Sequence, residues 1–113
     1  MIYSISEIRK VLEKELRGTP VKQAILFGSY AKGCPRVESD LDLVVDMDGK
    51  HQNFAFWGVY EILRNAFSVP VELFEKSEII PGQKIDLEIE KTGVVVYDRS
   101  KSYKPGQDDE VIE

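Results

Sequence analysis

Hydrophobic residues recur every three or four positions in two long segments of the chain, the spacing of one helix face. Segment 4–17 carries its apolar side chains at Ile5, Ile8, Leu12 and Leu16. Segment 51–67 carries them at Phe56, Val59, Tyr60, Leu63 and Phe67. Gly18-Thr19-Pro20 ends the first pattern and Pro70 follows the second. Both segments are predicted to be amphipathic helices.

Four shorter apolar runs have the length of strands. They are residues 21–27 (VKQAILF), 41–45 (LDLVV), 69–74 (VPVELF) and 93–97 (GVVVY). Segment 84–91 (KIDLEIEK) fits two patterns, since its alternation suits a strand while Ile85 and Ile89 are one helical turn apart. Its Lys, Asp and Glu residues are poor strand formers, so we predict a helix.

The length of 113 residues is that of one domain, which we place at residues 1–98. The polar, acidic stretch 99–113 is predicted to be a loose tail. Hydrophobic residues make up 42% and charged residues 31%, which fits an ordinary folded chain rather than a disordered one.

The net charge and the cysteine content limit which binding partners and which cellular compartment are expected. A formal net charge of -5 disfavours sequence-independent binding to long nucleic acid, which depends on Lys and Arg. Cys34 is the one cysteine, so no internal disulfide can form, and the first residues include charges that a signal peptide lacks. We therefore expect a cytoplasmic protein with no membrane association, since no apolar run approaches the roughly 18 residues of a membrane span.

Two acids interrupt the apolar run at 41–45. In a strand, Asp40 and Asp42 project from the same side about 7 Å apart, at roughly 3.3 Å per residue. Two partly buried carboxylates at that distance repel each other unless a cation lies between them. Mg²⁺ binds a few carboxylates together with substrate phosphates, so the pair predicts a metal site for phosphoryl or nucleotidyl transfer.

A Gly-Ser turn follows the first predicted strand, with a short helical turn expected over residues 30–32. Gly28 lets the backbone approach a ligand, and the Ser29 hydroxyl and neighbouring amides can hold phosphate oxygens. Gly-Ser or Asp-x-Asp alone is usually structural. Together, ten residues apart, they fix four positions, and a chance match in such a chain is on the order of one in a thousand.

With "GSYAKG", "SDLDLVV" and "GVVVYD", the sequence resembles the minimal nucleotidyltransferases (MNT), small relatives of DNA polymerase beta, over residues 20–98. The resemblance implies an α+β fold, a mixed β-sheet packed by helices. It also implies two Mg²⁺ ions and transfer of a nucleoside monophosphate from a triphosphate to an acceptor hydroxyl. Asp40 and Asp42 would then be catalytic metal ligands, and Gly28, Ser29 and Lys32 would bind the nucleotide.

A third carboxylate is expected on a neighbouring strand, to bind metal and help deprotonate the acceptor. Glu72 is the one acid inside the strand predicted at 69–74, and it is our candidate. The family usually has Asp there, so full activity is in question. The alternative is that Glu72 is a solvent-facing strand residue.

Stand-alone chains of this size resemble the antitoxins of HEPN-type toxins. That resemblance implies a magnesium-dependent transfer of AMP from ATP to a toxin tyrosine. One alternative is a catalytically weak binding module of the same fold that neutralises a toxin by complex formation. Another is a small-molecule nucleotidyltransferase, although such enzymes normally carry an additional helical domain.

Phe54 and Trp57 fall on the face of the second helix opposite its apolar stripe. Either this face meets a partner, because Trp is favoured at interfaces, or a thick core surrounds the helix.

Overall fold

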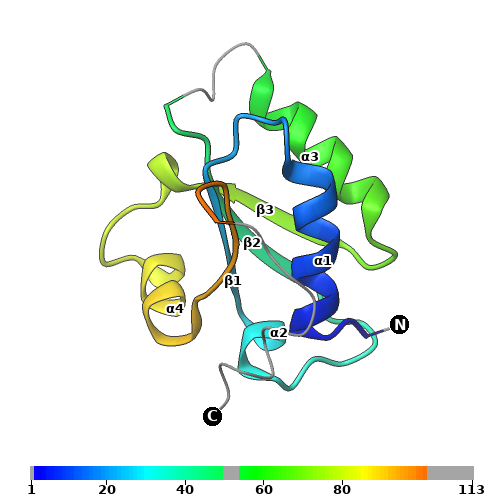
Figure 1. Cartoon of the computed structure of the whole chain (residues 1–113). Coiled ribbons are helices and arrows are strands. Elements are labelled where there is room, and N and C mark those ends of the chain that lie inside the picture. Colours follow the sequence, from blue (N-terminus) through cyan, green and yellow to red (C-terminus); the bar gives the residue numbers. More distant parts are fainter. Residues whose placement is uncertain (1, 50–53, 102–113) are drawn as a thin grey trace.

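A four-stranded mixed sheet forms the centre of the molecule, with helices on both of its faces (Figure 1). The computed structural model describes residues 2–49 and 54–101. In chain order, the elements are α1 (Ile5–Leu16), β1 (Gln23–Phe27), α2 (Ser29–Lys32), β2 (Leu41–Asp46), α3 (Ala55–Ala66), β3 (Val71–Glu75), the 3₁₀ turn η1 (Lys76–Glu78), α4 (Lys84–Thr92) and β4 (Val94–Asp98).

The strands lie in the order β3-β2-β1-β4. β1 runs antiparallel to both β2 and β4, whereas β2 and β3 are parallel. The return from β2 to a parallel β3 goes through α3, as a parallel pair requires a long crossover connection. The predicted α+β class, a mixed sheet packed by helices, is confirmed.

Helix α1 begins where its sequence provides a cap. The Ser4 side chain accepts a hydrogen bond from the Glu7 backbone N–H, and the Glu7 carboxylate accepts one from the Ser4 N–H at 2.7 Å. This reciprocal capping box satisfies two amides that the first helical turn leaves unpaired. Ile8, Leu12 and Leu16 then follow at helical spacing and are fully buried.

The main core lies between the sheet and the pair α1 and α3, which lie together on one face in Figure 1. It combines the buried side of α1, Val59 and Leu63 of α3, and alternate residues of the strands, among them Leu26, Leu41, Leu43, Val45 and Val71. The polar residues between them, such as Asp42 and Glu72, therefore lie on the other face.

Segment 84–91, whose pattern fitted both structures, is helical as predicted. Helix α4 lies on the face of the sheet opposite α1 and contacts β1 (Figure 1). Asp86 in its first turn accepts a hydrogen bond from the Gly82 N–H at 2.8 Å, which supports the helix start. Ile85 and Ile89 are half-buried, as expected for an amphipathic helix that covers part of a sheet.

Several predicted boundaries are shifted. Residues 21 and 22 precede β1 instead of belonging to it, and β3 begins at Val71 and extends to Glu75. Helix α3 begins at Ala55 with Phe54 as its N-cap in a left-handed conformation (φ 65°). The predicted start at His51 lies outside the described residues.

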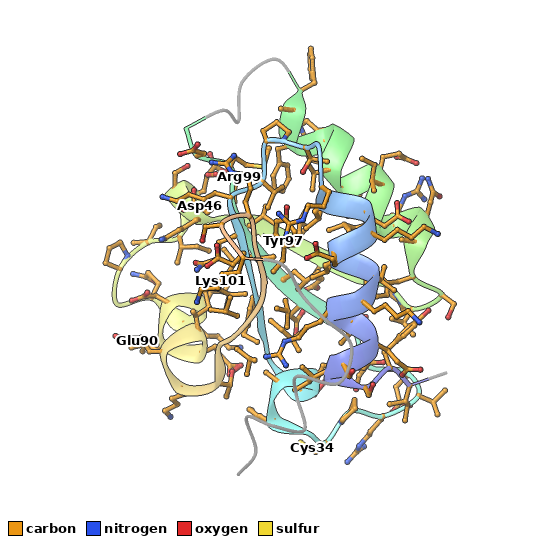
Figure 2. All side chains as sticks on the ribbon, in the orientation of Figure 1. Cys34, Asp46, Glu90, Tyr97, Arg99 and Lys101 are labelled. Atoms are coloured by element: carbon orange, nitrogen blue, oxygen red, sulfur yellow. The ribbon has the colours of Figure 1, made fainter. Side chains whose placement is uncertain are left out.

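The chain beyond β4 follows the body of the domain for three residues. The Arg99 N–H donates to the Lys22 carbonyl at 2.8 Å, and the Arg17 guanidinium donates to the carbonyls of Arg99 and Lys101. Figure 2 shows Arg99 and Asp46 at the end of the sheet opposite Cys34, which follows α2. Residues 102–113 lie outside the described part, and the domain boundary at residue 98 stays a prediction.

Two further sequence-based expectations concern the surface. Trp57 is 61% exposed and Phe54 more so, which excludes a core that surrounds α3 on all sides. Among residues 2–49 and 54–101, no helix has both the length and the apolar composition of a membrane crossing.

The α1 cap gives a test of the fold. Replacing Ser4 by Ala removes the acceptor for the Glu7 N–H, and we expect it to lower the free energy of unfolding by about 1 kcal/mol. Urea denaturation monitored by circular dichroism measures this loss. Glu7→Gln keeps an acceptor for the Ser4 N–H and should cost less; an equal or larger loss for Glu7→Gln would contradict the capping-box account.

Candidate active site

Asp42 and Glu72 lie side by side on neighbouring strands. Each is the second residue of its strand, and the parallel register of β2 and β3 pairs them directly. The Glu72 carboxyl group acts on that of Asp42 both as a hydrogen-bond partner and through its charge, which places the two side chains in contact. The sequence-based prediction that Glu72 lies next to the Asp-x-Asp pair is thus correct as to position.

Burial and neighbouring charges raise the pKa of Asp42 from 3.8 to about 7. Partial burial is the largest cause, because it disfavours the charged carboxylate. The hydrogen bond and charge of Glu72 come next, followed by the charges of Asp40 and Glu88. Ionisation of Asp42 is therefore unfavourable below about pH 7 in this site.

Asp40 lies just before β2 and is half-buried. Its charge acts on Asp42, which places the two acids close enough to interact, as predicted. Within residues 2–49 and 54–101, however, no three acidic, His or Cys side chains converge as a ready-made metal cage. The structure brings Asp42 and Glu72 into contact and leaves Asp40 beside them.

Gly28 makes the close approach of β1 to this pair possible. β1 ends at Phe27, which is paired with Asp42 in the antiparallel register, so Gly28 follows directly beside the carboxylate. A Cβ on Gly28 would overlap the Oδ2 atom of Asp42, and the φ of 78° is also one that other residues rarely adopt. Glycine at position 28 is therefore required twice, once for its backbone angle and once for space.

Ser29 and Lys32 are the first and last residues of α2, at the same end of the sheet. Ser29 is half-buried, and its carbonyl accepts a hydrogen bond from the Cys34 N–H at 3.1 Å, which closes the turn. Lys32 is exposed, and its Nζ atom lies 3.9 Å from Oε2 of Glu88. Lys32 is thus near the site, held at its rim by an acid of α4.

Two site residues from α4 were not found by the sequence analysis. Thr92 accepts a hydrogen bond from the Gly28 N–H at 3.2 Å, and the Glu88 charge acts on Asp42. No short motif contains them, because their position depends on α4 packing against β1. A further contact between residues far apart in the sequence joins Phe27, the residue before Gly28, to Phe74 on the strand of Glu72; the centroids of their rings lie 5.8 Å apart.

This arrangement has one side for phosphate and one for an attacking group. The order β3-β2-β1 places Glu72, Asp42 and Gly28 across three neighbouring strands. Backbone and hydroxyl donors gather on the β1 side, where a phosphate chain can bind, and the carboxylates extend from β2 to the outer strand β3. A group held beside Glu72 would face a phosphate held beside Gly28.

Comparison with known proteins supports this chemistry. A protein of Methanocaldococcus jannaschii named "Putative protein adenylyltransferase MJ1379" is 36% identical over 93 residues, which cover 79% of this chain and 81% of the relative. Among solved structures, a toxin-antitoxin with AMP-PNP matches with a TM-score of 0.62 and 24% identity, covering 91% of this chain and 78% of that one.

A second solved structure, a tri-AMPylated Shewanella oneidensis HEPN toxin in complex with its MNT antitoxin, matches with a TM-score of 0.50 and 22% identity, covering 95% of this chain and 75% of that one. At these identities, the structural matches establish a shared fold. The family profile described as "Nucleotidyltransferase domain" matches residues 5–94, which include every element from α1 to the start of β4. The chain therefore belongs to the nucleotidyltransferase domain family.

Proposed function

We propose that this protein transfers AMP from ATP to a hydroxyl group of a HEPN-type toxin, a tyrosine in particular, and so acts as its antitoxin. The observation that carries the proposal is the contact of Asp42 and Glu72 beside Gly28. The M. jannaschii relative named for protein adenylyl transfer supports AMP as the group transferred. The fold neighbours described as toxin-antitoxin complexes, one of them with a tri-AMPylated toxin, support the kind of acceptor.

The donor set fits Mg²⁺. This ion usually binds one or two carboxylates and completes its shell with water and substrate phosphates, so a full protein cage is not needed. Asp40, Asp42 and Glu72 would hold two such ions, and the raised pKa of Asp42 indicates a carboxyl group that gains from a neighbouring cation. When bound, Mg²⁺ would neutralise phosphate charge and make the acceptor hydroxyl more acidic.

The residues of α2 and the preceding glycine would position the triphosphate. The Ser29 hydroxyl and the backbone amides of the turn would donate hydrogen bonds to phosphate oxygens, and Gly28 lets this turn lie directly beside the Asp42 carboxylate. Lys32 can exchange its weak, exposed contact with Glu88 for a phosphate oxygen. The transfer then depends mainly on positioning and charge neutralisation.

Glu72 would act on the acceptor side. The acceptor oxygen attacks the α-phosphorus, the bond from that phosphorus to the bridging oxygen breaks, and pyrophosphate leaves. The proton of the hydroxyl passes to a carboxylate or to water, and Glu72 on the outer strand is the nearest candidate on that side.

The alternative of a catalytically weak binding module rests on one observation. Glu72 is longer by one methylene than the Asp usual in the family, and it shares a hydrogen bond with Asp42. A protein in which this contact persisted would bind its partner without modifying it.

Substitution of Asp42 tests the transfer directly. With labelled ATP, Mg²⁺ and the HEPN-type partner, we expect Asp42→Asn to reduce AMP transfer on the order of 10² to 10³-fold, since it removes a metal-binding charge. Glu90→Gln is a matched control, because Glu90 is exposed on α4 (Figure 2) and the α4 acid whose charge acts on Asp42 is Glu88. Equal transfer by wild type and Asp42→Asn would overturn the catalytic assignment.

Glu72 requires its own series. Glu72→Gln should reduce transfer about as strongly as Asp42→Asn if Glu72 acts on the acceptor, and Glu72→Asp should retain or increase it. Rates are measured with the partner in excess. Full transfer by Glu72→Gln would assign the third carboxylate elsewhere, and a tight wild-type complex without any transfer would support the binding module.

The raised pKa of Asp42 predicts how stability depends on pH without metal. The folded state holds this proton up to about pH 7, whereas the unfolded chain releases it near 3.8, so stability falls as pH rises from 3.8 to about 7 and levels off above that. Asp42→Asn removes the ionisation. We expect its melting temperature at pH 8 to exceed that of wild type by several degrees, and by less at pH 5.

Addition of Mg²⁺ provides the complementary measurement in the same thermal scans. The ion should raise the wild-type melting temperature at pH 8 more than that of Asp42→Asn, because the ionised carboxylates gain a partner. If the melting temperature of Asp42→Asn without metal did not exceed that of wild type at pH 8, the cost of ionising Asp42 described for this site would be contradicted.

A further inference from the structure

An apolar groove of about 630 Å³ lies along the outer edge of β3. One wall is formed by Phe56 and Trp57 at the start of α3 and the other by the η1 to α4 segment, with Ile79, Ile80 and Ile85. Leu73 and Phe74 of β3 form its floor. Trp57 and Ile80 are 61% and 63% exposed, so this part of the surface presents large apolar side chains to solvent.

The edge of β3 in this groove is open to hydrogen bonding. In the described chain, β3 pairs with β2 and with no strand on its other side. The Leu41 N–H donates to the Pro70 carbonyl at 2.8 Å, so the backbone groups of Pro70 face β2. Because these groups alternate along a strand, those of Val71, Leu73 and Glu75 face away from β2, and the last two of these residues line the groove.

The groove is continuous with the acceptor side of the site. Phe74 in its floor is two residues from Glu72 on the same strand face, and its ring contacts Phe27, the residue before Gly28. Phosphate donors lie on the opposite side, at the end of β1. A chain lying along β3 therefore passes Glu72 on the side from which an acceptor must arrive.

Charge and shape favour a polypeptide as the occupant. The lining carries Glu75, Glu78 and Lys84, and the whole chain has a net charge of -5, which disfavours a nucleic acid. An open strand edge between apolar walls matches an extended peptide, whose backbone would bond to the edge while alternate side chains enter the two walls. Trp57, in edge-to-face contact with Phe56 at 5.5 Å and Tyr60 at 6.2 Å, is a pre-positioned anchor.

We propose, on the basis of the function proposed above, that the acceptor protein docks an extended segment with apolar side chains as an added strand on β3. This docking places its hydroxyl group beside Glu72. The groove formed by Trp57, Ile80 and the β3 edge is thus the acceptor-binding site and determines which protein is modified.

Kinetics with the HEPN-type partner test the proposal. We expect Trp57→Glu and Ile80→Glu each to raise the KM for the partner at least tenfold, with kcat and the KM for ATP within twofold of wild type. Both side chains are largely exposed, so both variants should fold, which melting temperatures verify. Leu87→Glu is the matched control, an exposed apolar residue of α4 outside the groove lining.

Hydrogen exchange of the complex gives a readout independent of transfer. The proposal predicts slower exchange of the Leu73 and Glu75 amides when the partner is bound, with little change at the β4 edge. Normal partner KM in both groove variants, or unprotected β3 amides in a stable complex, would overturn it. If the groove variants raised only the KM for ATP, the groove would be assigned to the nucleotide. If the free wild-type protein formed dimers and Trp57→Glu did not, the groove would be assigned to a second copy of the chain.

These readouts separate the docking site from the activity. If no AMP is transferred, the proposed function fails, yet the affinity of the complex and the amide protection still measure docking on β3. If transfer occurs and neither variant affects it, the docking proposal fails alone.

Discussion

The contact between the carboxyl groups of Asp42 and Glu72 is the constraint on which the site depends. Parallel pairing of β2 and β3 holds the two residues opposite each other, so neither can move away without disturbing the sheet. Partial burial and the nearby Asp40 and Glu88 make ionisation of the pair costly. The fold therefore places carboxyl groups at one end of the sheet where their ionisation is costly, and the cations proposed above would lower that cost.

The same constraint also affects the turn at Gly28 and, through it, residues that belong to no short motif. Gly28 must lack a side chain because Asp42 occupies that space, and its N–H is bonded to Thr92 on α4. The hydrogen bond to Thr92 thus attaches the turn after β1 to helix α4, and the Asp42 carboxylate fills the space beside Gly28. The proposed nucleotide-binding turn and metal ligands are thus positioned by four elements, β1, β2, β3 and α4.

Local patterns predicted the parts of this site that are local. Gly28, Ser29, Asp40 and Asp42 lie within 15 residues, so their spacing alone was enough to predict that they belong to one site. Glu72 could also be predicted from the sequence, because it is the one acid in its predicted strand. Glu88 and Thr92 could not be predicted, because they lie in or next to a segment whose sequence fits both a helix and a strand. The position of this segment depends on packing against β1. The shift of β3 to Val71–Glu75 was similarly set by its register with β2.

The charges of β3 also bear on what can pair with its open edge. Glu72 and Glu75 flank the apolar Leu73 and Phe74. Parallel in-register pairing of two copies would place each glutamate opposite itself, and antiparallel pairing centred between Leu73 and Phe74 would place Glu72 opposite Glu75. Like charges directly opposite each other destabilise a strand pair, and charged edges are a common protection against self-association. The exposed charge of this pair is that of Glu72, because Glu75 is buried and its carboxylate accepts a hydrogen bond from the Ser77 N–H. The edge therefore remains suited to a different chain that carries a neutral or basic residue opposite Glu72.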